Sequence, residues 1–177
     1  MTRSLMTLII VLAAGCAASA GEIADLHRKT AKADPNRRDE CRSHDEADAK
    51  HHGVTEIGLE RSGCYGTCPV YTVIIKSDGT FRYKGEHFVK RTGEHTGTVS
   101  LYAFNHVAQY VRDSGFMDLQ ESYTRMVTDN PTTFTTAVID GKRKVVSNYA
   151  DAGPSKLWAI EQLIDKLLLE AKWDESK

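Results

Sequence analysis

The sequence predicts one α+β domain, in which a mainly antiparallel sheet of about five to six strands is covered on one face by two amphipathic helices. Three observations support this fold class. Stretches with apolar residues at every second position are joined by the hairpin dipeptides Asp78-Gly79 and Asp140-Gly141. Two longer stretches repeat apolar residues at helical spacing. Such short hairpin connections favour antiparallel over parallel pairing.

The strands are predicted from alternation and from turn residues. In chain order they are residues 55–60, 70–76, 80–84, 88–89, 132–139 and 143–149. The second of them is apolar at nearly every position, which predicts a central strand covered on both faces. Gly93 and Gly97 are predicted to mark turns, because glycine is frequent where a chain reverses direction.

The two helices are predicted from capping residues and apolar periodicity. Ser100 is a suitable N-cap for the first helix, and Gly115 is a suitable C-terminal cap. Pro154 is predicted as the first residue of the second helix. The expected buried face of that helix is Leu157, Ile160, Ile164, Leu167, Leu168 and Ala171.

Residues 1–20 are predicted to be a signal peptide of the lipoprotein type. Arg3 precedes an apolar run of about ten residues, whereas a membrane span needs about 20. The run leads into Leu12-Ala13-Ala14-Gly15-Cys16, which has the form of a bacterial lipobox with Ala13 at the usual leucine position. The mature chain would then begin at a lipid-bearing Cys16, in a membrane protein of the cell envelope that faces the periplasm or the exterior. The alternative is cleavage after Ala20, which predicts a soluble secreted protein.

Residues 21–53 are predicted to be a flexible charged tether. They contain few large apolar residues and many charged ones, so they cannot bury enough surface to offset the entropy of ordering. Cys41, His44, His51 and His52 are all side chains of the kind that ligate metals, but their spacing matches no compact zinc pattern. We therefore favour a solvated linker and keep metal binding by these residues as an alternative.

The most specific stretch is Gly63-Cys64-Tyr65-Gly66-Thr67-Cys68-Pro69. Export would place its cysteines in an oxidising compartment, and we favour a Cys64–Cys68 disulfide. This bond would close a ring of about five residues and stabilise the fold by about 2 kcal/mol. The alternatives are a thiol redox couple assisted by Arg61, the nearest cation in sequence, or a metal site that needs further ligands.

A candidate binding surface combines this corner with a later loop. It comprises Arg61, Tyr65, Arg125, Thr128 and Asp129, because loops on a rigid scaffold often carry function. The alternative is structural: Thr128 and Asp129 would shape the turn that follows them by bonding to neighbouring backbone groups. Tyr65 is either an exposed recognition aromatic or a packed corner residue.

Charge and motifs exclude some classes of function and favour others. The chain carries 23 Lys and Arg against 24 Asp and Glu, which argues against nucleic acid as a partner. Nucleophile, zinc-protease and phosphate-loop motifs are absent from the sequence. We therefore expect no catalytic residue, cofactor or metal in the domain, and favour a non-catalytic module that binds a protein or an envelope component. A thiol redox protein using Cys64 and Cys68 is the alternative.

Residues 57–71 resemble an uncharacterised bacterial domain family of unknown function. The resemblance is carried by Gly63, Cys64, Gly66, Cys68, Pro69 and Tyr71, which match a Gly-Cys-x-Gly-x-Cys-Pro-x-Tyr signature. A second motif of that family is similar to Tyr123, Thr128-Asp129 and Pro131-Thr132-Thr133. The family occurs often in exported proteins and lipoproteins. The resemblance covers about residues 54–172, nearly all of the α+β globular domain that we predict over residues 54–174. It implies an exported chain and no catalytic residue.

Overall fold

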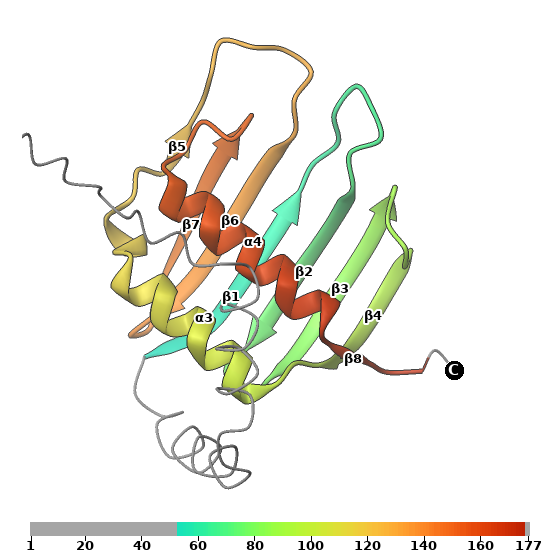
Figure 1. The fold of residues 1–177 in the computed structure, drawn as a ribbon, viewed down its shortest axis with the longest axis vertical. Helices are drawn as coiled ribbons and strands as arrows, with labels where there is room; N and C mark the ends of the chain where they lie inside the picture. Colours follow the sequence, from blue (N-terminus) through green and yellow to red (C-terminus); the bar gives the residue numbers. More distant parts are fainter. Residues whose placement is uncertain (1–52, 176–177) are drawn as a thin grey trace, which may run out of the picture. The chain divides into compact units, whose positions relative to one another are not determined.

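The computed structural model describes residues 53–175. The predicted signal peptide, Cys16, Cys41 and the tether histidines lie outside the described residues. With the labels of Figure 1, the elements are β1 Val54–Arg61, β2 Val70–Lys76, β3 Thr80–His87, β4 Gly93–Thr98, α3 Leu101–Asp113, the 3-10 turn η1 Phe116–Asp118, β5 Ser122–Tyr123, β6 Thr132–Ile139, β7 Lys142–Tyr149, α4 Ser155–Leu169 and β8 Lys172–Trp173.

The strands form one open sheet in the order β5-β7-β6-β1-β2-β3-β4-β8. Every neighbouring pair is antiparallel except β5 and β7. The prediction of an α+β fold with a mainly antiparallel sheet is therefore confirmed. The predicted number of strands is wrong, because the sheet has eight. Two of the missed strands, β5 and β8, are only two residues long and form at the edges of the sheet.

The β3–β4 hairpin also differs from the prediction. Phe88-Val89 is not a strand but part of the turn, where Phe88 has a positive φ of 54°. The glycine-rich stretch that follows is strand β4. Gly97 is needed there because a Cβ would lie 2.7 Å from the Phe81 ring and 2.2 Å from the carbonyl oxygen of Lys172. Glycine in this strand therefore permits a close approach, one of the roles it plays in sheets.

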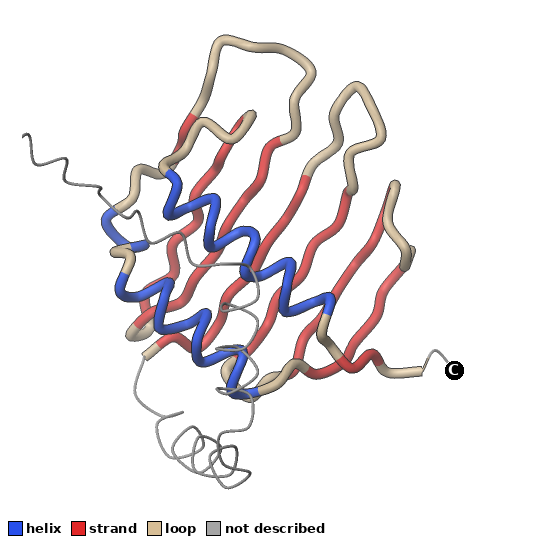
Figure 2. Tube along the Cα trace, viewed as in Figure 1, coloured by secondary structure: helices blue, strands red, loops and turns tan. Residues whose placement is uncertain are grey.

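Both helices lie on the same face of the sheet (Figures 1 and 2). The core between them and the strands is formed by buried side chains such as Ile57, Val73, Phe104 and Ile164. Gly115 has a φ of 68°, as expected for a helix-terminating residue. Ser100 occupies the N-cap of α3 but makes no side-chain capping bond, and Pro154 is the N-cap of α4 rather than its first residue.

No helix of the described part covers the opposite face of the sheet (Figure 1). The predicted coverage of residues 70–76 on both faces is therefore wrong. Ile74 is 37% exposed on this face, while its neighbours Val73 and Ile75 are fully buried under the helices. Among residues 53–175, no helix is long and apolar enough to cross a membrane.

The course of β1 separates two ends of the domain. The chain enters at Val54, and β1 ends at Arg61 at the opposite end of the sheet (Figure 1). Three loops gather at that far end: residues 62–69, 88–92 and 124–131. We call these three loops the loop end. The first connects β1 to β2, the second connects β3 to β4, and the third precedes β6.

Candidate functional site

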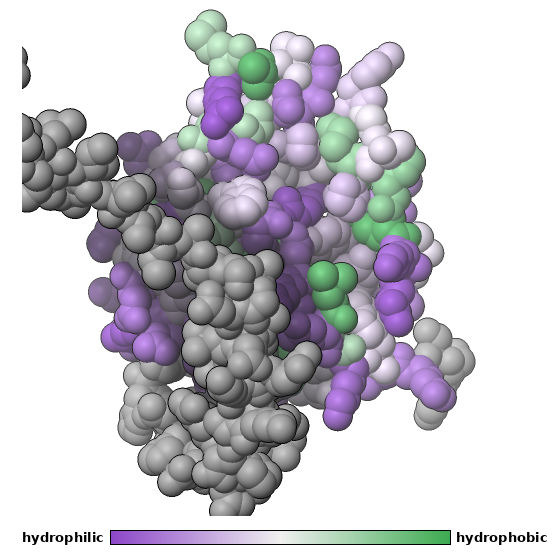
Figure 3. Space-filling view, in the orientation of Figure 1, coloured by the Kyte–Doolittle hydropathy of each residue, from purple (hydrophilic) through white to green (hydrophobic). Residues whose placement is uncertain are grey.

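A pocket of about 730 Å³ opens beside the loop end, between the C-terminal half of α4 and the strands β2 and β3. Its size lies within the range of small-molecule sites. The residues that line it are Pro69, Tyr71, Tyr83, Phe88, Val89, Pro131, Leu168, Leu169, Ala171 and Trp173, together with Cys68 and the polar or charged Arg61, Lys90, Arg91, Gln162 and Asp165. In the space-filling view, hydrophobic residues gather toward the loops and the β3–β4 side (Figure 3).

Aromatic rings from distant parts of the chain form one wall of this pocket. Trp173 meets Tyr83 edge to face, with ring centroids 5.1 Å apart, and Tyr83 stacks on Tyr71 at 5.5 Å. Strand β8 holds Trp173 there, because Trp173 pairs with Gly97 of β4. The Arg91 guanidinium lies 4.5 Å from the centroid of the Trp173 ring, a cation–π contact.

Arg61 is the centre of a polar network at the base of the pocket. Its Nη2 donates to Asp165 Oδ2 at 2.7 Å, its Nε donates to the Tyr71 hydroxyl at 3.1 Å, and its Nη1 donates to Thr133 Oγ1 at 3.1 Å. The Tyr71 hydroxyl donates in turn to Asp165 Oδ1. Both carboxylate oxygens of Asp165 are therefore occupied.

The pKa values of Tyr71 and Arg61 are both raised, so neither of these two groups changes its charge near neutral pH. Burial raises the pKa of Tyr71, and the neighbouring Asp165 carboxylate raises it further. Burial alone would lower the pKa of Arg61, but the attraction of Asp165 together with the contacts to Tyr71 more than offsets this, so that its pKa is raised. A general acid or base works best when its pKa lies near the working pH. Tyr71 and Arg61 are therefore suited to structure and binding rather than to proton transfer.

Glu161, one helical turn before Asp165, is a buried carboxyl that the sequence did not single out. It is 0% exposed, and its Oε1 accepts a hydrogen bond from Asn148 Nδ2 at 3.0 Å. Its Oε2 has no partner among the described residues. Burial raises the pKa of Glu161, an effect that the bond from Asn148 only partly opposes. Glu161 does not line the pocket, so we treat it as part of the core.

We expect Glu161→Gln to stabilise the domain at high pH but not at low pH. Folding raises the pKa of Glu161, so its carboxyl group does not destabilise the fold below the ordinary carboxyl pKa. The free energy of unfolding then falls as the pH rises through the raised pKa. Glutamine stays neutral, so the variant should gain about 1 kcal/mol in free energy of unfolding at pH 8 and almost nothing at pH 4. Urea unfolding at both values measures this. Glu170→Gln, at the exposed C-cap residue of α4, is the control, and an equal gain at both pH values would contradict the expectation.

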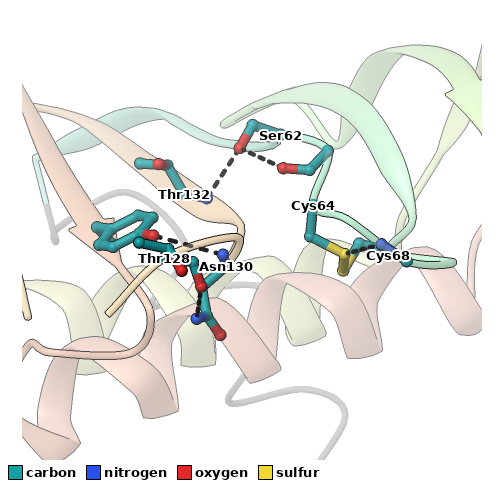
Figure 4. The surroundings of a disulfide bond; sticks show 9 residues. Ser62, Cys64, Cys68, Thr128, Asn130 and Thr132 are labelled. Carbon is teal, nitrogen blue, oxygen red and sulfur yellow. Dashed lines mark hydrogen bonds between the residues drawn. A yellow bond between two sulfur atoms is a disulfide. The ribbon is translucent and has the colours of Figure 1, made fainter. Parts of the chain in front are cut away.

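The cysteine corner is part of the loop end (Figure 4). Cys64 and Cys68 form a disulfide. Backbone hydrogen bonds tie this corner to the third loop and to the start of β6: Ser62 N donates to Thr132 O at 2.9 Å, and Tyr65 N donates to Asp129 O at 3.4 Å. Ser62 Oγ accepts from Thr132 N at 2.8 Å. The disulfide thus lies beside the pocket, and the hydrogen bonds of its corner join two of the three loops.

The structure does not bring the five residues of the predicted binding surface together at the pocket. Tyr65 is 90% exposed, so its interpretation as a packed corner residue is wrong. Arg125 Nη2 donates to the carbonyl of Asp151 at 2.9 Å. Thr128 and Asp129 contribute backbone carbonyls to loop hydrogen bonds, and Asp129 has a φ of 64°. Of the five predicted residues only Arg61 lines the pocket.

Several pocket residues were missed by the sequence analysis. Asp165 belongs to the polar side of an amphipathic helix, and Trp173 follows that helix, so neither carries a local signal. Lys90-Arg91 does carry one, since two cations directly after Phe88-Val89 in a hairpin loop form an amphipathic tip. Arg61, which a redox couple would need as its cation, donates instead to Asp165, Tyr71 and Thr133.

Comparison with known proteins identifies the domain without assigning it an activity. Within the described residues there is no group of three side chains that could hold a metal ion. No curated protein matches the chain. Residues 55–168 match the family described as a domain of unknown function, DUF6438. This match covers most of the chain, which therefore belongs to the DUF6438 family.

Proposed function

We propose that the domain is a non-catalytic binding module of the bacterial cell envelope, attached by a lipid on Cys16, and that it takes a protein or an envelope component at its loop end. The observation that carries this proposal is the exposure of large apolar side chains on all three loops. Tyr65 is 90% exposed, Phe88 63% and Met126 fully exposed. Gathered exposed apolar groups of this kind mark interaction sites.

The position of the loop end supports the same proposal. β1 has eight residues, so Val54 and Arg61 lie roughly 25 Å apart along the strand. A tether that arrives before Val54 would join the domain at the end opposite the loop end. The three loops would then be accessible to a partner without obstruction at the point of attachment.

In-cell photo-crosslinking tests the proposal. A photoreactive phenylalanine analogue at Tyr65, Phe88 or Met126 is expected to give a discrete adduct, because these side chains would contact the partner. The same analogue at Ile74, on the sheet face that lies away from the helices, is the matched control. Equal labelling at Ile74, or no adduct at the three loop positions, would contradict the proposal. Cys16→Ser should release the protein from the membrane fraction if the lipid anchor is correct.

Thiol redox chemistry is the second candidate function. The observation that favours it is the position of the disulfide, since Cys68 lines the pocket and both cysteines are only half-buried. A substrate in the pocket would lie beside the sulfur atoms. Metal binding by Cys41, His44, His51 and His52 concerns residues outside the described part of the chain.

A further inference from the structure

We propose that the pocket binds an anionic amphiphile: a molecule with one carboxylate or phosphate group and an extended apolar body. This inference rests on the proposed binding function and names the ligand class of the site. The chemistry is shared by a free fatty acid and by an anionic membrane lipid. The juxtaposition that carries it is an apolar aromatic pocket with two cations at its mouth that have no acidic partner within residues 53–175.

The pocket exposes apolar side chains to water that an apolar ligand would cover. Tyr83 is 6% exposed and forms the aromatic wall of the pocket with Trp173 beside it. Phe88 and Leu169 also line the pocket, yet they are 63% and 81% exposed. Covering apolar surface contributes about 25 cal/mol for each Å² removed from water. A ligand with an extended apolar body would cover these two side chains and fill the pocket.

The charges around the pocket select the sign of the ligand. Arg61 and Asp165 neutralise one another at the base. Lys90 and Arg91 remain, and within residues 53–175 neither forms an ion pair with a carboxylate. The nearby Glu86 pairs with Lys84 instead, at 2.7 Å. The lining therefore has a surplus of two positive charges, which favours an anion and disfavours a cation.

Arg91 is also held in a geometry suited to an anionic group. Its guanidinium lies over the Trp173 ring at 4.5 Å, and it makes no hydrogen bond to a protein acceptor in the described part of the chain. A guanidinium stacked on an aromatic ring keeps its edge N–H groups available, and these match the two oxygens of a carboxylate or phosphate. Lys90, next in sequence, would add a second positive charge. The anionic group would thus lie at the mouth and the apolar body inside.

Fluorescence titration tests this inference on the chain from residue 17 onward, which lacks only the predicted signal segment and Cys16. The chain has two tryptophans, so Trp158→Phe leaves Trp173 as the single reporter in the pocket. Palmitate below its micelle-forming concentration is expected to change this emission saturably, and hexadecanol, the neutral molecule of equal chain length, is expected to bind at least tenfold more weakly. Sedimentation with phosphatidylglycerol and phosphatidylcholine vesicles forms the second arm.

Variants separate the charge from the fold. Lys90→Gln and Arg91→Gln are each expected to weaken the binding of the anionic ligand about tenfold, the loss of one charge-assisted contact. Arg91 contacts the Trp173 ring, so the Arg91→Gln change would itself alter the fluorescence. The affinity of this variant for the ligand is therefore measured by calorimetry. Arg82→Gln removes an exposed cation from β3 outside the pocket and should leave binding unchanged. Circular dichroism confirms that each variant is folded.

The outcomes distinguish the sources of the ligand and the two proposals. Binding of palmitate in solution indicates a free amphiphile, whereas sedimentation with phosphatidylglycerol alone indicates a membrane lipid. Equal binding of hexadecanol, insensitivity to Lys90→Gln and Arg91→Gln, or no binding in either arm would overturn the inference. Adducts at Tyr65, Phe88 or Met126 in the crosslinking experiment would still support the proposed function in each of these cases.

Discussion

Asp165→Ala is expected to lower the free energy of unfolding by about 2 to 3 kcal/mol. The change would leave the Arg61 guanidinium, whose side chain is only 17% exposed, without its counter-ion. It would also leave the Tyr71 hydroxyl without its acceptor. Removing one partner of a fully buried pair costs about 3 to 5 kcal/mol, and the partial exposure of Asp165 reduces this figure. Urea unfolding at neutral pH measures the loss.

Two further variants show what Asp165 contributes. Asp165→Asn keeps an oxygen that can accept from Tyr71 but removes the charge, so it should recover part of the loss. Glu170→Ala breaks the exposed pair between the C-cap residue of α4 and Lys166 in its last turn, where the two charged atoms lie 3.8 Å apart. Such exposed pairs contribute about 0.5 kcal/mol. If Asp165→Ala cost no more than Glu170→Ala, the network would not be holding α4 to the sheet.

Opening the Cys64–Cys68 disulfide is expected to lower the free energy of unfolding by about 2 kcal/mol, from the entropy that the ring removes from the unfolded chain. The native fold should persist, because the core lies in the sheet and helices rather than at this corner. Unfolding of the Cys64→Ser, Cys68→Ser double variant, compared with the oxidised chain, measures the loss. In the chain from residue 17 onward, Cys41→Ser in both proteins removes the one further cysteine and so prevents thiol exchange.

The reduction potential of the same bond decides between its two interpretations. A structural bond is expected to have a potential below about −300 mV. A potential above about −200 mV, together with unchanged stability after reduction, would instead support the thiol redox function. Either result also bears on the loop end, because the corner is hydrogen-bonded to the residues before β6.

The sequence predicts those parts of the fold that are set by local chemistry. The two helices follow from apolar periodicity, and the β2–β3 and β6–β7 hairpins follow from Asp-Gly turns. Strand β4 was missed because Gly97, the residue that packs against the Phe81 ring, has no side chain. The strand therefore shows no apolar alternation in the sequence. Strand β8 is only two residues long and is defined by its pairing with β4. Two residues after a helix are too few to show the alternation that predicts a strand.

The same distinction explains the site. Arg61 and the cysteine corner could be identified because their residue types are unusual at those positions. Asp165 lies 104 residues from Arg61 in sequence, and only the crossing of α4 over the sheet brings the two together. Glu161 is ionisable but lies at a buried position of its helix. A search for apolar periodicity counts only apolar residues, so it could not identify Glu161 as a core residue.

The central position of β1 has a mechanical consequence. This strand is hydrogen-bonded to β2 on one side and to β6 on the other, antiparallel in both cases. A pull exerted between residue 53 and a partner held at the loop end would act along the strand and load both ladders in shear. Many bonds would then have to break together instead of opening one after another. A domain under tension between an anchor and its ligand would therefore hold at forces that would unzip a strand pulled from the edge.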